Sequence, residues 1–547
     1  MKLKRVLAVL LAMVCAFSLA ACGNSEGGKS DTPAATKAPA ADTKETMAAD
    51  DTQAPTEAAD DGEDEDLADI NVMFWTLNTV PTDKETVEDA INAITEERIN
   101  TTVHLNIIEM GNYIQQVNLM MSSNEKLDLM VTLPGGPAHF NSMSSQKQLM
   151  DITDLLNQYG QDILKLIPQN WLDATTIDGK IYSVTSYGDK ATPLNIICRT
   201  DVLEETGIDP TTIKTANDLE ALFAKVKELH PEMVPVGTGS KKILTAPYLI
   251  DADGNFVKYD GLGDGDNSLI GIMDGDGTTI QNNYLRQEYI DTSLRFKQWY
   301  DNGWVYKDGA SYDETAESLI SGGTAFSYFK QTAMDAEAAV SATCGNPMTL
   351  IQLEDDPMLG TGAFRKFSWA VPTTATEPEA AVKFMNLIFT DAEVLNLLTW
   401  GVEGVHYQTM EDGSIDFLDG QDANSCGYYL GDETSILGNG FLAKVRNGQA
   451  TDLRERCEAA NLSATVSEFN GFSFNSDGFE NQVAGITNTI EEYRPTFANG
   501  LYTEEYYNEF IKKLKDNGVE EYLAYIQQQL DDWVAANTAN QVNVNVN

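Results

Sequence analysis

The residues that could bind a metal are few, and their spacing does not form a site. Residues 251–255 read Asp-Ala-Asp-Gly-Asn, which starts like a calcium loop, but Phe256 stands where such a loop needs glycine. We therefore predict hairpin turns through this Asp-Gly-rich stretch, which extends to Asp276. The histidines lack zinc-ligand spacing; they are His104, His139, His230 and His406. We expect neither a metal nor a cofactor.

Signatures of nucleophilic and nucleotide chemistry are also missing or misplaced. The chain has no Gly-x-Ser-x-Gly turn and no zinc-binding helix, so we expect no enzyme. Residues 23–30 fit the spelling of a phosphate-binding loop, but that loop needs a strand before it and a helix after it. Glycoside hydrolases use a pair of carboxylates, and with 84 acidic residues in the chain the spacing of acids in the sequence cannot exclude such a pair. A surface glycoside hydrolase therefore stays an alternative.

The composition indicates a large, acidic and folded protein. The chain has 547 residues, 42% of them hydrophobic, which predicts two or more domains with sizeable cores. Its formal net charge of −48 argues against binding to nucleic acids. The cysteines are too few for a disulfide scaffold. Four of them are widely spaced, and we expect buried thiols or one disulfide among Cys198, Cys344, Cys426 and Cys457.

Hydrophobic periodicity after residue 66 predicts a parallel sheet with crossover helices. Strands and helices alternate as strand 70–75, helix 86–99, strand 103–107, helix 113–121 and strand 127–133. Ligands of such sheets bind beyond the carboxyl ends of the strands. The residues there are 75–78 after the first strand and 132–136 after the third.

Further helices are predicted by their caps and apolar faces. Thr215 and Asp218 form the pattern of a capping box. Pro378 suits the first turn of a helix, and Asp391 caps the next one. A last helix is predicted over 523–534.

The N-terminal segment is predicted to be a signal peptide followed by a tether. Residues 1–21 hold three basic residues and twelve consecutive apolar ones, too short a run to span a bilayer comfortably. The sequence Leu-Ala-Ala-Cys-Gly around Cys22 resembles a bacterial lipobox, which implies a diacylated cysteine. Residues 22–66 are acidic and of low complexity, and we predict a disordered tether.

The remaining chain resembles the extracellular solute-binding lipoproteins of bacterial ABC importers for sugars. The most specific segment is Gly-Val-Glu-Gly-Val-His-Tyr at 401–407. Residues 179–184 resemble the family's approach to its hinge, although Thr185 stands where proline is usual. Weaker matches lie at 151–156, 198–203, 207–210, 296–304 and 322–326, and at 517–531, which resembles the family's C-terminal domain of unknown function.

This resemblance implies an α/β protein of the two-lobe, type II periplasmic-binding-protein fold, joined by a hinge and carrying a C-terminal helical extension. The expected divisions are lobe 1 at 67–188, lobe 2 at 189–345, a return to lobe 1 at 346–405, and a C-terminal region at 406–547 that completes lobe 2 and adds the extension. The implied protein is a monomer, lipid-anchored on the extracellular face of the cell membrane. It captures an oligosaccharide by hinge closure and delivers it to the ABC permease. A peptide or amino-acid receptor on the same scaffold is the second alternative.

Sugar rings stack on aromatic side chains, and their hydroxyls bind carboxylates, amides and backbone groups. Trp75 is a candidate because it lies at the end of a predicted strand, and the resemblance implies that Tyr187 and Tyr328 are candidates. The candidate ligand-binding residues are Trp75, Asn78, Gly135, Tyr187, Tyr328, Trp369, Trp400 and Glu403.

The acidic charge is not confined to the tether. Residues 1–21 carry +3 and residues 22–66 carry −10, which leaves −41 of the −48 on residues 67–547. This charge weighs against polyanionic sugars unless a local basic pocket overrides it.

Overall fold

The computed structural model describes residues 67–544 except 246, 265–266, 274, 313–314, 335, 356 and 432–433. The predicted signal segment 1–21, the lipidation site Cys22 and the tether 22–66 therefore lie outside the described residues.

The first sheet contains the three strands predicted at 70–75, 103–107 and 127–133, and two further strands, β16 and β6, make it a mixed sheet rather than the predicted parallel one. Its order is β2-β1-β3-β16-β6, with β1 parallel to β2 and β3, and β16 antiparallel to β3 and β6. These strands are β1 Ala68–Thr76, β2 Thr101–Glu109, β3 Leu129–Val131, β6 Val184–Thr185 and β16 Ser368–Ala370. The predicted strand–helix alternation at the start of the folded part is confirmed.

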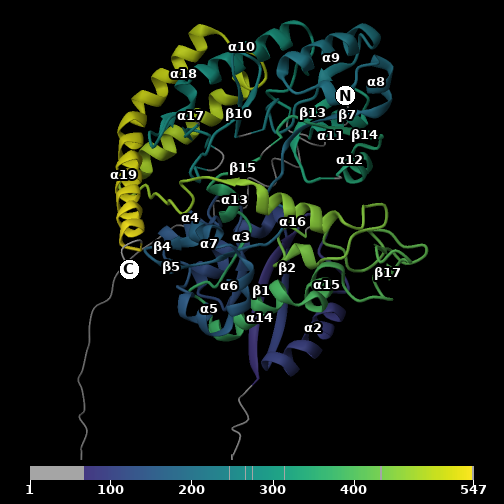
Figure 1. Cartoon of the computed structure of the whole chain (residues 1–547), viewed down its shortest axis with the longest axis vertical. Coiled ribbons are helices and arrows are strands. Elements are labelled where there is room, and N and C mark those ends of the chain that lie inside the picture. Colours follow the sequence, from purple (N-terminus) through teal and green to yellow (C-terminus); the bar gives the residue numbers. More distant parts are fainter. Residues whose placement is uncertain are drawn as a thin grey trace, which may run out of the picture. The chain divides into compact units, whose positions relative to one another are not determined.

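Helices bury their apolar faces against this sheet and form the first lobe (Figure 1). The predicted caps are present: Pro378 occupies the first turn of its helix, and the Asp391 side chain accepts hydrogen bonds from the backbone of Glu393 and Val394. The helices are α2 Lys84–Ile99, α3 Met110–Ser123, α4 Phe140–Ser145, α5 Thr153–Tyr159, α6 Gln161–Leu166, α7 Gln169–Leu172, α13 Gly362–Arg365, α14 Pro378–Thr390, α15 Ala392–Trp400 and α16 Leu453–Ser463.

A second sheet, in the order β14-β7-β13-β8, forms the second lobe. Its strands are β7 Leu194–Arg199, β8 Val234–Val236, β13 Ala325–Gln331 and β14 Met348–Gln352. Its helices are α8 Thr200–Thr206, α9 Ala216–Leu229, α10 Gln287–Asp301, α11 Ala316–Ser321 and α12 Glu337–Cys344. The predicted capping box of Thr215 and Asp218 is present at the start of α9.

Small hairpins decorate both lobes. The Asp-Gly-rich stretch includes the turn 251–255 between β9 and β10, where Gly254 has a φ of 90° and the Asp251 side chain accepts from the Asn255 backbone. The turn predicted there is confirmed. The paired strands are β4 Thr176–Ile177 with β5 Lys180–Ile181, β9 Tyr248–Ile250 with β10 Phe256–Lys258, β11 Ile270–Gly271 with β12 Gln281–Asn282, and β17 Gln408–Thr409 with β18 Ile415–Asp416.

The chain crosses between the two lobes at the strand ends of each sheet that face the other lobe, which we call the hinge-facing edges. The first crossing runs from the end of β6 to the start of β7, and the second from the end of β14 to the start of β16. In the second crossing, β15 Met358–Leu359 pairs with β19 Thr465–Val466, which belongs to a third crossing. The strand directions place the carboxyl ends of β1, β3, β8 and β13 at these edges. Both lobes therefore turn their ligand-binding edges toward the hinge.

The C-terminal extension is helical, as predicted. Helices α17 Glu480–Phe497, α18 Glu504–Asp516 and α19 Val519–Val544 share a hydrophobic core with residues 262–284 of the second lobe. The division at residue 405 differs from the packing, because Tyr428, Leu430 and Ile436 belong to the core of the first lobe. This stretch consists of loops, so no periodicity in the sequence marks which core it joins.

All four described cysteines, Cys198, Cys344, Cys426 and Cys457, are buried and free. Among the described residues, no three His, Cys, Asp or Glu side chains cluster closely enough to hold a metal ion.

Candidate functional site

The hinge-facing edge of the first lobe carries two exposed loops. The loop after β1 leaves Leu77 65% and Val80 42% exposed, and Asn78 is exposed between them. The loop after β3 contains Gly135, whose surroundings are open where a side chain would stand. Apolar and amide groups at this edge provide the mixed surface that small-molecule sites use.

Trp75 lies beneath this edge rather than on it. Its side chain is only 3% exposed, and its ring lies 5.5 Å from that of Phe367. Its indole Nε1 is buried without a hydrogen-bond partner. Phe367 has a φ of 57°, a left-handed conformation that costs energy in a non-glycine residue and is common at functional sites. Phe367, which lies at the end of the second crossing, therefore packs on Trp75, a predicted ligand-binding residue.

Trp400 takes part in an aromatic group at the same end of the first lobe. A cavity of ≈ 10 Å³, about the space one water needs, is lined by Trp400, His406, Tyr407, Ile415, Asp416, Phe417, Tyr428, Tyr429 and Arg446. The Trp400 Nε1 and His406 Nε2 atoms are buried and unpartnered. The backbone of Val402 donates to His406 Nδ1, so the proton of the neutral ring is on Nε2. Two N–H donors thus line one small cavity, which suits a single water or hydroxyl oxygen.

His406 stays neutral in this setting. Burial lowers the pKa of the imidazole, and the nearby Asp83 opposes that effect only in part. The Asp83 Oδ2 atom lies 3.7 Å from His406 Nε2.

Glu403 is the exposed carboxylate of this group. Its Oε1 accepts from Thr409 Oγ1 at 2.5 Å, and its Oε2 lies 3.5 Å from Lys444 Nζ. The hydrogen bond from Thr409 lowers the pKa of Glu403, so the side chain is ionised at neutral pH. An ionised, accessible carboxylate can accept hydrogen bonds from two hydroxyl groups.

Asn78 and Glu403 are far apart in the chain, and a third segment, residues 427–430, connects their loops. On the Glu403 side, the His406 ring lies 5.7 Å from the Tyr428 ring. The Thr76 hydroxyl donates to Leu430 O at 3.0 Å, and the Asp83 backbone donates to Gly427 O at 3.1 Å. We call Asn78, Trp400, Glu403, His406 and Tyr407 the rim group, since all five lie at the hinge-facing end of the first lobe.

Three other predicted site residues lie in the hydrophobic cores. Tyr187 is 2% exposed and donates to Glu458 at 2.9 Å, and Trp369 is fully buried and donates to Ile436 O at 2.9 Å. Tyr328 is buried against α11 and α12 in the second lobe. Large aromatic rings gain the most from burial, so an aromatic side chain alone is a weak sign of a binding site.

A pair of aromatic residues on the second lobe was not among the predicted site residues. Tyr306 and Tyr312 are both half-buried, and their rings lie edge to face with centroids 5.2 Å apart. The Tyr306 backbone donates to Val236 O, so the pair lies at the carboxyl end of β8. In the sequence, the local signal for this pair is two tyrosines in a loop that is rich in Gly, Ser and Asp.

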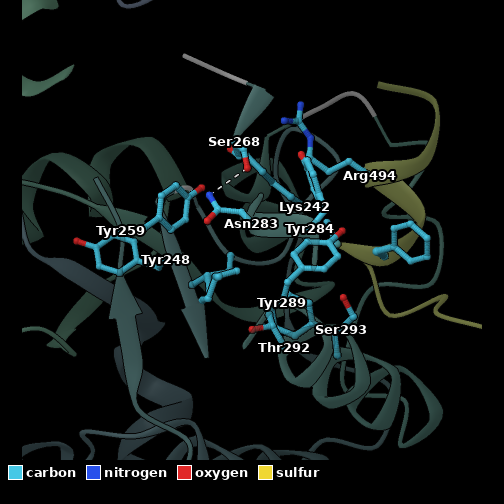
Figure 2. A pocket seen from close by; sticks show the side chains of 15 residues that line it. Lys242, Tyr248, Tyr259, Ser268, Asn283, Tyr284, Tyr289, Thr292, Ser293 and Arg494 are labelled. Carbon is cyan, nitrogen blue, oxygen red and sulfur yellow. Dashed lines mark hydrogen bonds between the residues drawn. The ribbon is translucent and has the colours of Figure 1, made fainter. Parts of the chain in front are cut away.

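A larger cavity of ≈ 80 Å³ lies apart from this edge, between the second lobe and α17. Figure 2 shows Tyr248 and Tyr259 on one side, Thr292 and Ser293 of α10 on another, and Arg494 near the top. It is smaller than the sites that enclose drug-sized ligands.

Comparison with known families matches most of the folded part. Residues 78–394 match the family described as bacterial extracellular solute-binding protein. Residues 468–535 match a domain of unknown function, DUF3502, and contain most of α17–α19.

Two characterised relatives are similar in sequence. The chain is 22% identical over 477 residues to a carbohydrate ABC transporter substrate-binding protein of Streptococcus pneumoniae, covering 85% of this chain and 91% of that protein. It is 27% identical over 268 residues to the polygalacturonan/rhamnogalacturonan-binding protein YtcQ of Bacillus subtilis, covering 45% of this chain and 49% of that protein.

Solved structures share the fold. The N-glycan transport solute-binding protein NgtS of Streptococcus pneumoniae superposes with a TM-score of 0.72 at 20% identity, covering 86% of this chain and 99% of that one. The alginate-binding protein AlgQ2 without calcium superposes with a TM-score of 0.57 at 15% identity, covering 85% and 98%.

Proposed function

The chain belongs to the bacterial extracellular solute-binding proteins, and we propose that its solute is an oligosaccharide bound between the two lobes and handed to an ABC permease. The observation that carries this proposal is the rim group, which joins indole, phenol, imidazole and carboxylate groups at a hinge-facing edge. Such groups recognise sugar faces and hydroxyls. The relatives named above for carbohydrate and for polygalacturonan/rhamnogalacturonan support the same class of ligand.

In the proposed mechanism, the sugar first binds the rim group of the first lobe. The second lobe then approaches and adds the Tyr306–Tyr312 pair, so that closure is stabilised by contacts that exist only with ligand. His406 and Trp400, which are 1% and 5% exposed, each offer one N–H to an oxygen in the water-sized cavity, and the exposed Glu403 accepts from hydroxyls. None of these steps breaks a bond in the sugar, in keeping with a non-catalytic receptor.

We also propose that diacylated Cys22 anchors the protein at the extracellular face of the membrane. Among the described residues, no helix is long and apolar enough to cross a bilayer. Two acyl chains suffice for stable anchoring. Cys22→Ser is expected to move the protein from the membrane fraction of the host cell to the medium, and a variant that stays membrane-bound would contradict the lipid anchor.

Calorimetric titration with a panel of neutral and acidic oligosaccharides tests the proposed ligand class. At least one glycan should bind, and Glu403→Gln should weaken it at least ten-fold through loss of a charged acceptor. Glu232→Gln, an equal change at an exposed residue of the second lobe, is the control and should bind normally. Binding of peptides but of no glycan would overturn the proposal, and cleavage of the glycan would identify a hydrolase.

A further inference from the structure

Two lysines lie on the segments that cross between the lobes. Lys190 belongs to the first crossing and is 5% exposed, and Lys366 belongs to the second and is half-buried. Their positions are unexpected, since residues 67–547 carry a net charge of −41. Lysine is rarely buried unless its charge is paired.

Neither ammonium group forms an ion pair among the described residues, although the nearby charge of Asp189 acts on Lys190. Lys190 Nζ donates only to Ala363 O, at a long 3.4 Å, and lies 6.0 Å from the centre of the Phe364 ring. For Lys366 Nζ, the described part of the chain provides no hydrogen bond and no ion pair. A desolvated charge in this situation destabilises the ligand-free protein.

The positive charges are also close enough to affect one another. Burial and then the charge of Lys366 lower the pKa of Lys190 to about 7. Burial and then the charge of Lys258 lower the pKa of Lys366. The fully buried Arg365 stands next to Lys366 in the chain and donates to Ala174 O. Lys190, Lys366 and Lys258 therefore act on one another near the hinge, where like charges repel, and Arg365 is a further cation of the second crossing.

The carboxylates that face these cations are engaged elsewhere. Asp260 accepts hydrogen bonds from Leu262 and Thr361. Glu354 accepts from Leu194 and Tyr248 and lies 3.8 Å from Lys258 Nζ. Asp189 faces Lys190, and burial raises its own pKa. These groups balance part of the charge around Lys258, but none forms an ion pair with Lys190 or Lys366.

We propose that Lys366 and Lys190 hold the carboxylate of an acidic sugar residue, such as a hexuronate, at the hinge end of the ligand site. Lys366, the more exposed of the two, contacts the carboxylate, and Lys190 adds its charge from behind. The site lies where both crossings meet the ligand-binding edges, and an anion there neutralises the unpaired charge in a low-dielectric setting. This inference rests on the proposed function and specifies the class of its ligand.

The test compares each acidic glycan with its own methyl ester, which keeps the sugar and removes the charge. The probes are trigalacturonate, sialyllactose and their methyl esters, titrated calorimetrically beside a set of neutral oligosaccharides. We expect an acid to bind at least ten-fold tighter than its ester, with the preference shrinking in 1 M salt. Lys366→Met should abolish the preference, and Lys297→Met, which removes an exposed charge paired with Asp301 on α10, should keep it.

The variant Lys190→Met distinguishes a lysine whose charge serves ligand binding from a lysine whose charge stabilises the fold. It should weaken binding of the acid and raise the thermal midpoint of the ligand-free protein, whereas a structural lysine would lower that midpoint when replaced. If Lys190→Met fails to fold, Lys366→Met still decides the question. Equal affinity for acid and ester, or binding of neutral glycans alone, overturns this inference and leaves the proposed function standing. Binding of no glycan at all overturns the proposed function and this inference with it.

Discussion

Some of the unpartnered buried donors lie around the rim group. The indole N–H groups of Trp75 and Trp400 and the Nε2 of His406 are buried without a hydrogen-bond partner, although Asp83 Oδ2 lies 3.7 Å from His406 Nε2. Leaving a buried donor unsatisfied costs about 1–3 kcal/mol, so these atoms are weak points of the free protein. A ligand or an ordered water that accepts from them removes this cost.

Trp400→Phe should reveal what the indole N–H contributes. We expect oligosaccharide affinity to fall about ten-fold because a donor to a sugar hydroxyl is lost, which corresponds to roughly 1.4 kcal/mol. Trp533→Phe makes the same chemical change in α19, where the ring packs on Phe472, and should leave affinity unaltered. Equal affinities for both variants by calorimetry would remove Trp400 from the site.

The buried Lys190 should make stability depend on pH in a defined direction. Its pKa is about 7 in the folded protein, against an ordinary 10.5 in the unfolded chain. Between these values the unfolded chain binds more protons, so the free energy of unfolding rises with pH, and this contribution is lost as pH falls through 7. Denaturant titrations at several pH values from 7 to 9.5 give the free energy of unfolding at each pH. This free energy should rise less steeply with pH for Lys190→Met than for the wild type. An unchanged slope would show that burial does not lower the pKa of Lys190.

At the scale of elements, α16 sets the course of the first crossing. Asn461 near its end is 2% exposed, and its side chain accepts from the backbone of Lys190 and Ala191 at 2.9 and 2.8 Å. The same side chain donates to Gly188 O at 2.7 Å. One amide thus satisfies three backbone groups that would otherwise be buried and unpaired.

Asn461→Ala is therefore expected to destabilise the protein by about 3 kcal/mol or more, since two buried N–H groups and one carbonyl lose their partner. Denaturant unfolding measures this loss. The exposed Asn157→Ala is the matched control and should change stability by less than about 0.5 kcal/mol. A loss as small as that of the control would mean that the crossing keeps its course without α16.

At the scale of the whole molecule, three crossings connect two lobes whose ligand-binding edges face the hinge. Few-stranded connections of this kind absorb the backbone changes of hinge closure while each lobe keeps its own core. The extension α17–α19 shares its core with residues of the second lobe. We therefore expect the extension to move with that lobe.

Ligand-induced closure predicts a smaller molecule in solution. Small-angle X-ray scattering should show a lower radius of gyration on addition of a glycan that binds in calorimetry. Glu403→Gln at the same glycan concentration should show less of this change because fewer molecules are occupied. A bound state with an unchanged radius of gyration would argue against closure as the mode of capture.

Local patterns in the sequence were sufficient to predict three strands of the first sheet and several helix starts, but not β6 and β16. The alternation of Ile70, Val72 and Phe74 predicted β1, and Thr215 and Asp391 predicted helix starts that the structure contains. These signals depend on neighbours within about four residues, so they are readable without the fold. The family resemblance added the two-lobe architecture that the comparisons support.

Only the tertiary structure decided which candidates share a surface. Tyr187, Tyr328, Trp369 and Trp400 are all at most 5% exposed, and Trp400 differs from the others only in lining a water-sized cavity at the rim. The topology alone brings Lys190 and Lys366 together, because each lies on a different crossing of the hinge. The acidic composition argued against anionic sugars, yet charge acts through distance and local dielectric rather than through the total. A net charge read from the sequence therefore says little about a site that distant segments assemble.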